Sequence, residues 1–344
     1  MEQIRIKPHF SCIVHTPDIV ELRHGVWNSS SHMLNDESAE GILAKIILEL
    51  NGKSNPAEIA SDIGVSRSKV ESVLDYLQQL GVLQRKSESF IDCYVDNIIP
   101  TLRRPGQYKC EITKPIVFVG DQYINQKITA QLDSLLEVEI IDGTEQWDLI
   151  KKSGDNWLFD ALEQKKFIEK FQSWQDKLII FSSRYINPIL ATRINRIAYE
   201  LNIPWLHLAL DGPFIFIGPT FRGNNGPCYD CFETRVSMNL RESEGYQKYK
   251  NALANHQVYT HDGDPLLGVT SNILIVHATL EILNYLATNC SFTTDKTLSI
   301  FLPTMEFVYH EVLRLPACRT CGSVSNRDNT QLYFDFQRLI DEVV

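Results

Sequence analysis

Two short stretches decide how the larger part of this chain folds. They are Gly226-Pro227-Cys228-Tyr229-Asp230-Cys231 and Cys318-Arg319-Thr320-Cys321-Gly322. Each places two cysteines in the spacing C-x-x-C within a predicted tight turn, so together they offer four thiolates, the ligand number of a closed tetrahedral zinc site. A redox pair needs only one such spacing, at a helix start within a thioredoxin-like pattern that this sequence lacks. We therefore predict a structural zinc ion bound by Cys228, Cys231, Cys318 and Cys321.

The sequence around these turns alternates between strand and helix patterns from Pro115 onward. Strands are predicted at 116–119, 138–141 and 178–181, and helices at 125–136, 158–174 and 188–201. A hairpin through Asp211-Gly212 joins strands at 205–210 and 214–217, and a long helix at 268–287 precedes strands at 297–302 and 305–313. This order predicts a doubly wound α/β sheet with an antiparallel extension. The polar stretch 241–264 is predicted to be a surface loop, and His207 a core residue with satisfied nitrogens.

Composition narrows the class of protein. The chain has 344 residues, enough for two domains, and 33 Lys/Arg against 43 Asp/Glu give a net charge of −10. That balance argues against a general binder of nucleic acid or of anionic membranes. The N-terminus lacks the apolar core of a signal peptide, and the apolar stretch 266–286 is interrupted by polar residues, which is typical of a buried helix. We expect a cytoplasmic protein.

The first 86 residues form a separate pattern. Strands are predicted at 10–14, 19–22 and 26–34, and helices at 42–50, 56–63 and 66–80, before a last strand at 82–83. The second and third helices have the spacing of a helix-turn-helix, with Arg67 and Lys69 available to contact phosphates. The strands precede the helices, however, whereas a DNA-binding winged helix normally has its hairpin after the recognition helix. Residues 1–95 also hold 9 Lys/Arg against 13 Asp/Glu, so both observations argue against DNA binding.

This order of strands and helices resembles the PqqD-like domain, a winged helix-turn-helix recognition element for ribosomally made, post-translationally modified peptides. The resemblance implies that a leader peptide adds a strand to the third strand and packs against the third helix, by β-augmentation. It places peptide-binding residues on the edge strand and on the facing helix: Trp27, Asn28, Ser29, Ser30, Ser31, His32 and Met33, with Lys69, Ser72, Val73 and Tyr76. A plain edge strand under a loop is the alternative.

The larger part, over about residues 115–325, resembles the ThiF-like fold of ubiquitin-activating enzymes. Its most specific signal is Phe216-Ile217-Gly218-Pro219, followed by the two cysteine turns on either side of a long helix. The resemblance implies three segments: a PqqD-like domain at 1–86, a connector at 87–113 and a zinc-stapled ThiF-like scaffold at 114–344. Enzymes of that family adenylate a peptide C-terminus with ATP.

The sequence departs from that family where ATP would bind. The turn after the first strand reads Gly120-Asp121-Gln122, with one glycine and an aspartate that would repel phosphate. The stretch 182–185 has no metal-binding aspartate, and no cysteine nucleophile lies between Phe232 and Asn289. Asp142 could serve as a ribose-binding acid, which is a weak signal alone. We expect no ATP and no catalytic residue.

Together, the two resemblances indicate the leader-binding, ocin-ThiF-like partner protein, or cyclodehydratase C-component, of azole- and azoline-modified peptide pathways such as those of bacteriocins. They imply a non-catalytic homodimer that presents a precursor peptide to a YcaO-type, ATP-dependent cyclodehydratase for thiazoline or oxazoline formation, with a flavin dehydrogenase as a further partner. An adenylating ThiF-like enzyme and a winged-helix transcriptional regulator are the alternatives.

Overall fold

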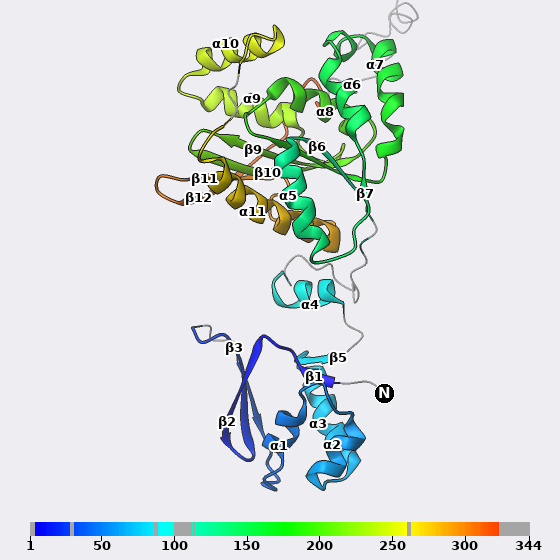
Figure 1. Ribbon diagram of the computed structural model, residues 1–344, viewed down its shortest axis with the longest axis vertical. Helices are drawn as coiled ribbons and strands as arrows, with labels where there is room; N and C mark the ends of the chain where they lie inside the picture. Colours follow the sequence, from blue (N-terminus) through cyan, green and yellow to red (C-terminus); the bar gives the residue numbers. More distant parts are fainter. Residues whose placement is uncertain are drawn as a thin grey trace, which may run out of the picture. The chain divides into compact units, whose positions relative to one another are not determined.

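A computed structural model of the chain describes residues 4–27, 31–85, 89–99, 112, 114–259 and 263–322. The chain divides into two compact units, Met1–Cys93 and Tyr94–Val344 (Figure 1). Each unit has its own sheet and its own hydrophobic core, so each is described by itself.

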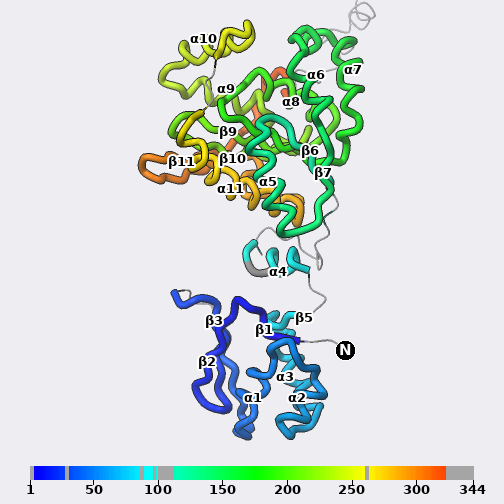
Figure 2. Tube along the Cα trace, in the orientation of Figure 1, coloured from blue at the N-terminus to red at the C-terminus, as the bar shows by residue number. Residues whose placement is uncertain are grey.

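The first unit contains the expected three strands followed by three helices. An antiparallel sheet has the order β2-β3-β4, and the elements are β2 Phe10–Thr16, β3 Ile19–His24, β4 Ser31–Asn35, α1 Leu43–Glu49, α2 Pro56–Ile63 and α3 Arg67–Gln79. A pair that the sequence did not predict closes the unit: β1 (Ile4–Ile6) is antiparallel to β5 (Leu83–Arg85) (Figure 2). This pair joins the two ends of the unit.

Local signals explain these helices. Asn55 caps α2 and accepts hydrogen bonds from the backbone N–H groups of Ala57 and Glu58, while the Glu58 carboxylate accepts from the Asn55 N–H. Gly64 ends the helix with φ of 76°, a left-handed conformation that glycine adopts without strain. The apolar faces that the periodicity predicted form the core: Val20, Leu22, Leu34, Ile46, Ile47, Val70 and Leu77 are each at most 2% exposed.

The second unit is built on a seven-stranded sheet of order β12-β11-β10-β9-β8-β6-β7. Its strands are β6 Ile116–Gly120, β7 Ile140–Ile141, β8 Leu178–Ser183, β9 Pro204–Asp211, β10 Phe214–Arg222, β11 Lys296–Phe301 and β12 Glu306–Glu311. Strands β7, β6, β8 and β9 are parallel, and β10, β11 and β12 continue the sheet antiparallel. The predicted parallel sheet with an antiparallel extension is therefore confirmed.

Helices cover both faces of this sheet (Figure 1). One face carries α5 (Gln122–Asp133) and α11 (Leu267–Thr288), which pack on each other and on the strands. The other face carries α6 Thr144–Lys152, α7 Ala161–Ile168, α8 Pro188–Glu200, α9 Tyr229–Asn239 and α10 Ser243–Ala254, with short 3-10 turns at η2 Asn156–Leu158 and η3 Glu169–Trp174. The predicted helix at 158–174 is thus divided between α7 and η3.

Among the described residues, α11 is the one helix long and apolar enough to cross a membrane by length and composition. Its C-terminal half is buried against the sheet, with Ala278, Ile282 and Leu283 each at most 2% exposed. This is the burial of a core helix, as the polar interruptions in its sequence indicated.

One prediction for this part of the chain needs correction. The stretch 241–264, predicted as a loop, contains α10. This helix buries none of its residues completely, and hydrogen bonds of Tyr246, Tyr249 and Lys250 attach it to the rest of the unit. Within the predicted connector, the structure describes a helix, α4 (Phe90–Asn97), whose Tyr94 hydroxyl donates to Asn284 Oδ1 at 2.8 Å.

Candidate functional site

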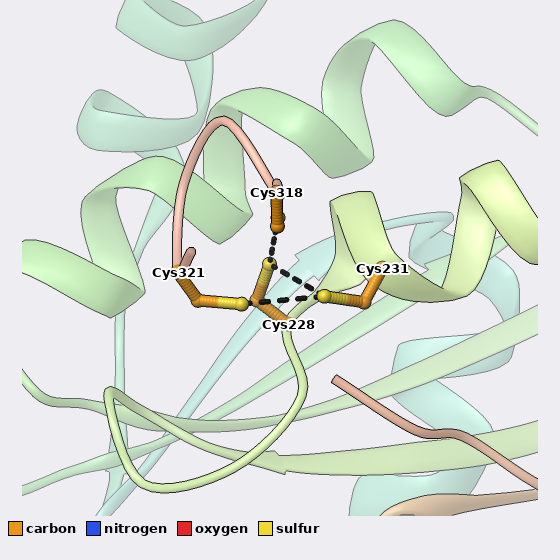
Figure 3. A group of neighbouring side chains, drawn as sticks. All are labelled: Cys228, Cys231, Cys318 and Cys321. Carbon is orange, nitrogen blue, oxygen red and sulfur yellow. Dashed lines mark hydrogen bonds between the residues drawn. The ribbon is translucent and has the colours of Figure 1, made fainter. Parts of the chain in front are cut away.

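The four cysteines that the sequence singled out lie together in the second unit (Figure 3). Cys228 is the N-cap residue of α9 and Cys231 lies in its first turn, while Cys318 and Cys321 lie in the turn after β12. Their Sγ atoms all lie within 4.8 Å of one another, with Cys228–Cys318 at 3.5 Å and Cys231–Cys321 at 3.2 Å. The cluster can hold a metal ion.

The donor set and its spacing fit zinc. Four sulfurs about 2.3 Å from a tetrahedral zinc ion lie about 3.8 Å apart. The sulfur separations of 3.2, 3.5 and 4.0 Å bracket that value. All four residues are at most 6% exposed, which leaves no open position for substrate. The arrangement is that of a structural metal site.

The surroundings orient the thiols, and hydrogen bonds among the thiols shift their pKa values in opposite directions, raising those of Cys228 and Cys231. Hydrogen bonds, first from the Cys228 thiol, lower the pKa of Cys318 to about 6, so a thiolate is available near neutral pH. The backbone N–H of Leu315 donates to Cys231 Sγ at 3.3 Å. Between the two turns, Thr320 Oγ1 donates to buried Asp230 Oδ2 at 2.7 Å. Sequence reasoning missed this last pair, although both residues stand inside the C-x-x-C spacings.

A groove in the first unit collects part of the predicted peptide-binding set. Lys69, Ser72, Val73 and Tyr76 of α3 all line a cavity of about 240 Å³. The rest of its wall comes from Leu77, also of α3, and from residues at the end of β4 and in or next to α1: Leu34, Asn35, Asp36, Ile42, Leu43 and Ile46. The groove is mainly apolar, and the Lys69 Nζ at its edge lies 2.5 Å from Glu40 Oε2.

Among the residues that the structure describes, none of those predicted to bind peptide on the edge strand lines the groove. Ser31, His32 and Met33 belong to β4, which pairs with β3 and is an edge strand among the described residues. Met33 is 55% exposed. Trp27 is fully exposed and precedes β4. Asn28, Ser29 and Ser30 lie outside the described residues.

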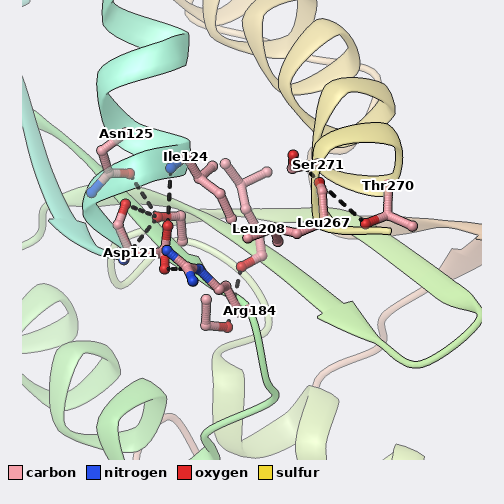
Figure 4. A network of polar contacts seen from close by, with 10 residues as sticks. Asp121, Ile124, Asn125, Arg184, Leu208, Leu267, Thr270 and Ser271 are labelled. Carbon is pink, nitrogen blue, oxygen red and sulfur yellow. Dashed lines mark hydrogen bonds and ion pairs between the residues drawn. The ribbon is translucent and has the colours of Figure 1, made fainter. Parts of the chain in front are cut away.

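A third candidate position is the crevice at the carboxyl ends of β6 and β8, where an open α/β sheet usually binds ligands. A cavity of about 480 Å³ here is lined by residues that include Gly120, Asp121, Ser182 and Arg184. Asp121 accepts from the Ile124 N–H at the start of α5, and its Oδ2 lies 2.6 Å from Arg184 Nε (Figure 4). The helix N-terminus that would hold a phosphate is therefore occupied by a carboxylate and its ion pair.

Backbone packing explains the single glycine of this crevice. Gly120 has φ of 104°, and a Cβ placed on it would lie 1.9 Å from the Ser182 carbonyl oxygen. The glycine therefore allows β6 to approach β8, rather than a nucleotide. Asp142, the candidate ribose acid, accepts from the N–H and the hydroxyl of Thr144, so it caps the start of α6.

His207 departs from its prediction. It is 2% exposed, as expected of a core residue, but neither of its ring nitrogens has a hydrogen-bond partner. The prediction that it is satisfied was wrong, because its aromatic neighbours Phe181, Trp205 and Tyr229 surround the ring without offering a partner.

Comparison with known proteins establishes the fold. No protein-family model and no curated protein matches the sequence. Among solved structures, the heterocyclase TruD shares 19% identity with a TM-score of 0.64, over 94% of this chain and 43% of TruD. A heterocyclase in complex with substrate and cofactor shares 18% identity with a TM-score of 0.64, over 95% of this chain and 40% of the heterocyclase.

A second group of similar structures is represented by the microcin C7 biosynthetic enzyme MccB in complex with N-formylated MccA. It shares 12% identity with a TM-score of 0.54, over 94% of this chain and all of MccB. The chain therefore has the mixed α/β fold of these solved structures, together with a buried four-cysteine cluster. It spans about two fifths of the length of the heterocyclases that it matches.

Proposed function

We propose that this protein binds the leader of a ribosomally made precursor peptide and presents that peptide to a separate YcaO-type, ATP-dependent cyclodehydratase. The partner would convert Cys, Ser or Thr of the peptide to thiazoline or oxazoline, and a flavin dehydrogenase could oxidise the product. The fold likeness to a heterocyclase and to a protein solved with a peptide supports a role in peptide modification.

The observation that carries the proposal is the groove between α3 and β4. An extended peptide can add a strand to the edge of β4, where backbone hydrogen bonds give affinity without depending on sequence. Apolar side chains of the same peptide can enter the groove lined by Val73, Tyr76 and Leu34 and fix its register. This is the arrangement of a PqqD-like recognition element, which we assign to the first unit.

In this proposal the second unit is a ThiF-like scaffold and supplies no chemical step. Zinc bound by the four cysteines would stabilise it, and the Asp121–Arg184 ion pair disfavours ATP phosphates at the crevice. Tethering a substrate raises its effective concentration to the order of millimolar, so a non-catalytic subunit can still accelerate its partner. We further propose that the protein is cytoplasmic.

We also propose that the protein is a homodimer. Both α11 and β12 of the second unit carry exposed apolar side chains, including Val269, Val276, Phe307 and Tyr309, and the Phe307 ring of β12 lies 5.6 Å from the His277 ring of α11. A patch of this kind on a monomer usually marks an interaction site. Light scattering coupled to size exclusion measures the mass directly, and a monomer at micromolar concentration would contradict this part of the proposal.

Fluorescence polarisation with labelled leader peptides tests the docking role. The peptides come from short reading frames, rich in Cys, Ser and Thr, beside a YcaO-like frame. Val73→Asp places a charge in the groove and Tyr76→Ala removes one wall, so each should weaken binding by about tenfold or more. Asp75→Asn, on the exposed side of the same helix, is the matched control. If Val73→Asp and Tyr76→Ala bind the leader peptide as tightly as wild type does, the groove is not the peptide-binding site.

The likeness to MccB favours one other function, an adenylating enzyme. A parallel calorimetric titration with ATP and Mg²⁺ separates the two. Leader binding without nucleotide binding supports the docking protein, whereas nucleotide binding without leader capture supports adenylation. Binding to duplex DNA with a steep salt dependence would instead support a regulator.

A further inference from the structure

A cavity of about 540 Å³ in the second unit is lined by none of the four cysteines and has no part in the proposed function. Its wall comes from β9, β10, β11 and the end of β12 on one side and from α9 and α10 on the other. Its wall is mainly apolar and contains five aromatic rings: Phe216, Tyr229, Phe232, Tyr246 and Tyr249. Its size and lining are those of a small-molecule site.

Most polar groups around this cavity already have partners. Glu233 Oε1 accepts from the Tyr246 hydroxyl at 3.0 Å and from Lys250 Nζ at 2.8 Å. The Tyr249 hydroxyl donates to the Ile186 carbonyl at 2.8 Å, and His310 Nε2 lies 2.8 Å from Ser299 Oγ. These contacts hold α10 and β12 in place around the cavity and leave their own groups satisfied.

His207 is the exception. It projects from β9 into the wall of the cavity, is 2% exposed, and has no hydrogen-bond partner at Nδ1 or Nε2. Burial lowers the pKa of His207 to about 4, against a smaller opposing effect of the Gly218 backbone, which is near the ring without meeting hydrogen-bond geometry, so the ring is neutral at physiological pH. A neutral imidazole donates one hydrogen bond and accepts another. Buried polar groups are nearly always paired, and His207 is among the residues that line the cavity.

We propose that this cavity binds a neutral aromatic group that carries one hydrogen-bonding atom, and that His207 is the residue that orients it. The rings of Tyr229 and Phe232 lie 5.5 and 6.3 Å from the His207 ring, so they already pack around it at the distances of aromatic pairs. The apolar wall receives the body of the ligand, and the imidazole supplies the hydrogen bond that the wall does not. The aromatic group can belong to a peptide side chain or to a free small molecule.

The probe is 5-fluoroindole, observed by fluorine NMR with the full-length chain. Its matched analogue is 5-fluorobenzothiophene, which has nearly the same shape and no N–H. His207→Phe keeps the aromatic volume and removes both ring nitrogens. We expect 5-fluoroindole to bind wild type about fivefold to tenfold more tightly than His207→Phe, and 5-fluorobenzothiophene to bind both equally.

A filling variant locates the site. Val236→Trp places a large side chain in the wall of the cavity, whereas Leu162→Trp places the same side chain on the exposed face of α7. The first should abolish binding and the second should not, with thermal melts confirming that both fold. N-acetyl-5-fluorotryptophanamide distinguishes the sources: binding as tight as that of the indole indicates a peptide side chain, and its exclusion indicates a free molecule.

Three results would overturn the proposal. The first is no binding of 5-fluoroindole to wild type at millimolar concentration. The second is equal affinity of wild type and His207→Phe for 5-fluoroindole. The third is preferential binding of tetramethylammonium, which would make the site a cation cage built on the aromatic rings and Asp211. None of these results depends on whether the groove of the first unit binds a leader peptide.

Discussion

Replacing one ligand of the four-cysteine cluster should remove the metal and destabilise the second unit. Cys228 is 1% exposed and its sulfur lies 3.5 Å from that of Cys318 and 4.0 Å from that of Cys231. In Cys228→Ser only three thiolates remain to bind the metal, and the serine hydroxyl is a poor fourth ligand for zinc. We therefore expect zinc to fall from one ion per chain to nearly none.

The size of the effect follows from linkage. A ligand present at about a thousand times its Kd stabilises the folded state by about 4 kcal/mol. For a unit of this size each kcal/mol shifts Tm by about 2–4 °C, so the loss of zinc should lower Tm by about 10 °C. A strong zinc chelator added to wild type should produce a shift of the same size, because it removes the same metal.

Plasma mass spectrometry gives the zinc content, and differential scanning fluorimetry gives Tm. Cys12→Ser is the control, since this exposed thiol belongs to the first unit. It should keep the metal and the wild-type Tm. Wild-type zinc content in Cys228→Ser would refute the assignment, as would a zinc-supplemented wild type that purifies with no bound metal.

Three further predictions concern the sheet of the second unit. Gly120→Ala should lower the free energy of unfolding, measured with urea, by about 3 kcal/mol or more, because its Cβ would lie 1.9 Å from the Ser182 carbonyl oxygen. An unchanged urea midpoint would contradict this packing. Asp121→Ala should cost about 1–2 kcal/mol by removing the cap of α5, whereas Asp121→Asn, which keeps an acceptor for the Ile124 N–H, should recover most of that loss; equal costs would argue against the cap. His207→Phe should lose less stability in acid than wild type. Burial lowers the folded-state pKa of His207 from 6.5 to about 4, so the unfolded chain binds the proton first and stability falls as pH falls through this window. The difference in unfolding free energy between variant and wild type should grow by about 3 kcal/mol from pH 7 to pH 4, and a difference independent of pH would show that His207 is not buried as a neutral ring.

Part of this fold could be predicted because its signals are local. The helices predicted at 56–63 and 188–201 begin at Pro56 and Pro188 in the structure, and the side chains of Asn55 and Asn187 accept backbone N–H groups of their first turns. The apolar runs of β6 and β8 predicted buried parallel strands for the same reason. The helix α10 was missed because residues 241–264 are mainly polar, a composition that favours the prediction of a surface loop.

The sequence alone therefore predicted the three strands and three helices of the first unit, the doubly wound sheet of the second, and the four cysteines of the candidate metal site, because spacing and periodicity encode them over a few residues. Only the tertiary structure paired β1 with β5, placed Arg184 against Asp121, and left His207 without a partner beside an aromatic cavity. These features join residues far apart in the chain. Their contacts depend on strand order and helix packing, which no local pattern specifies.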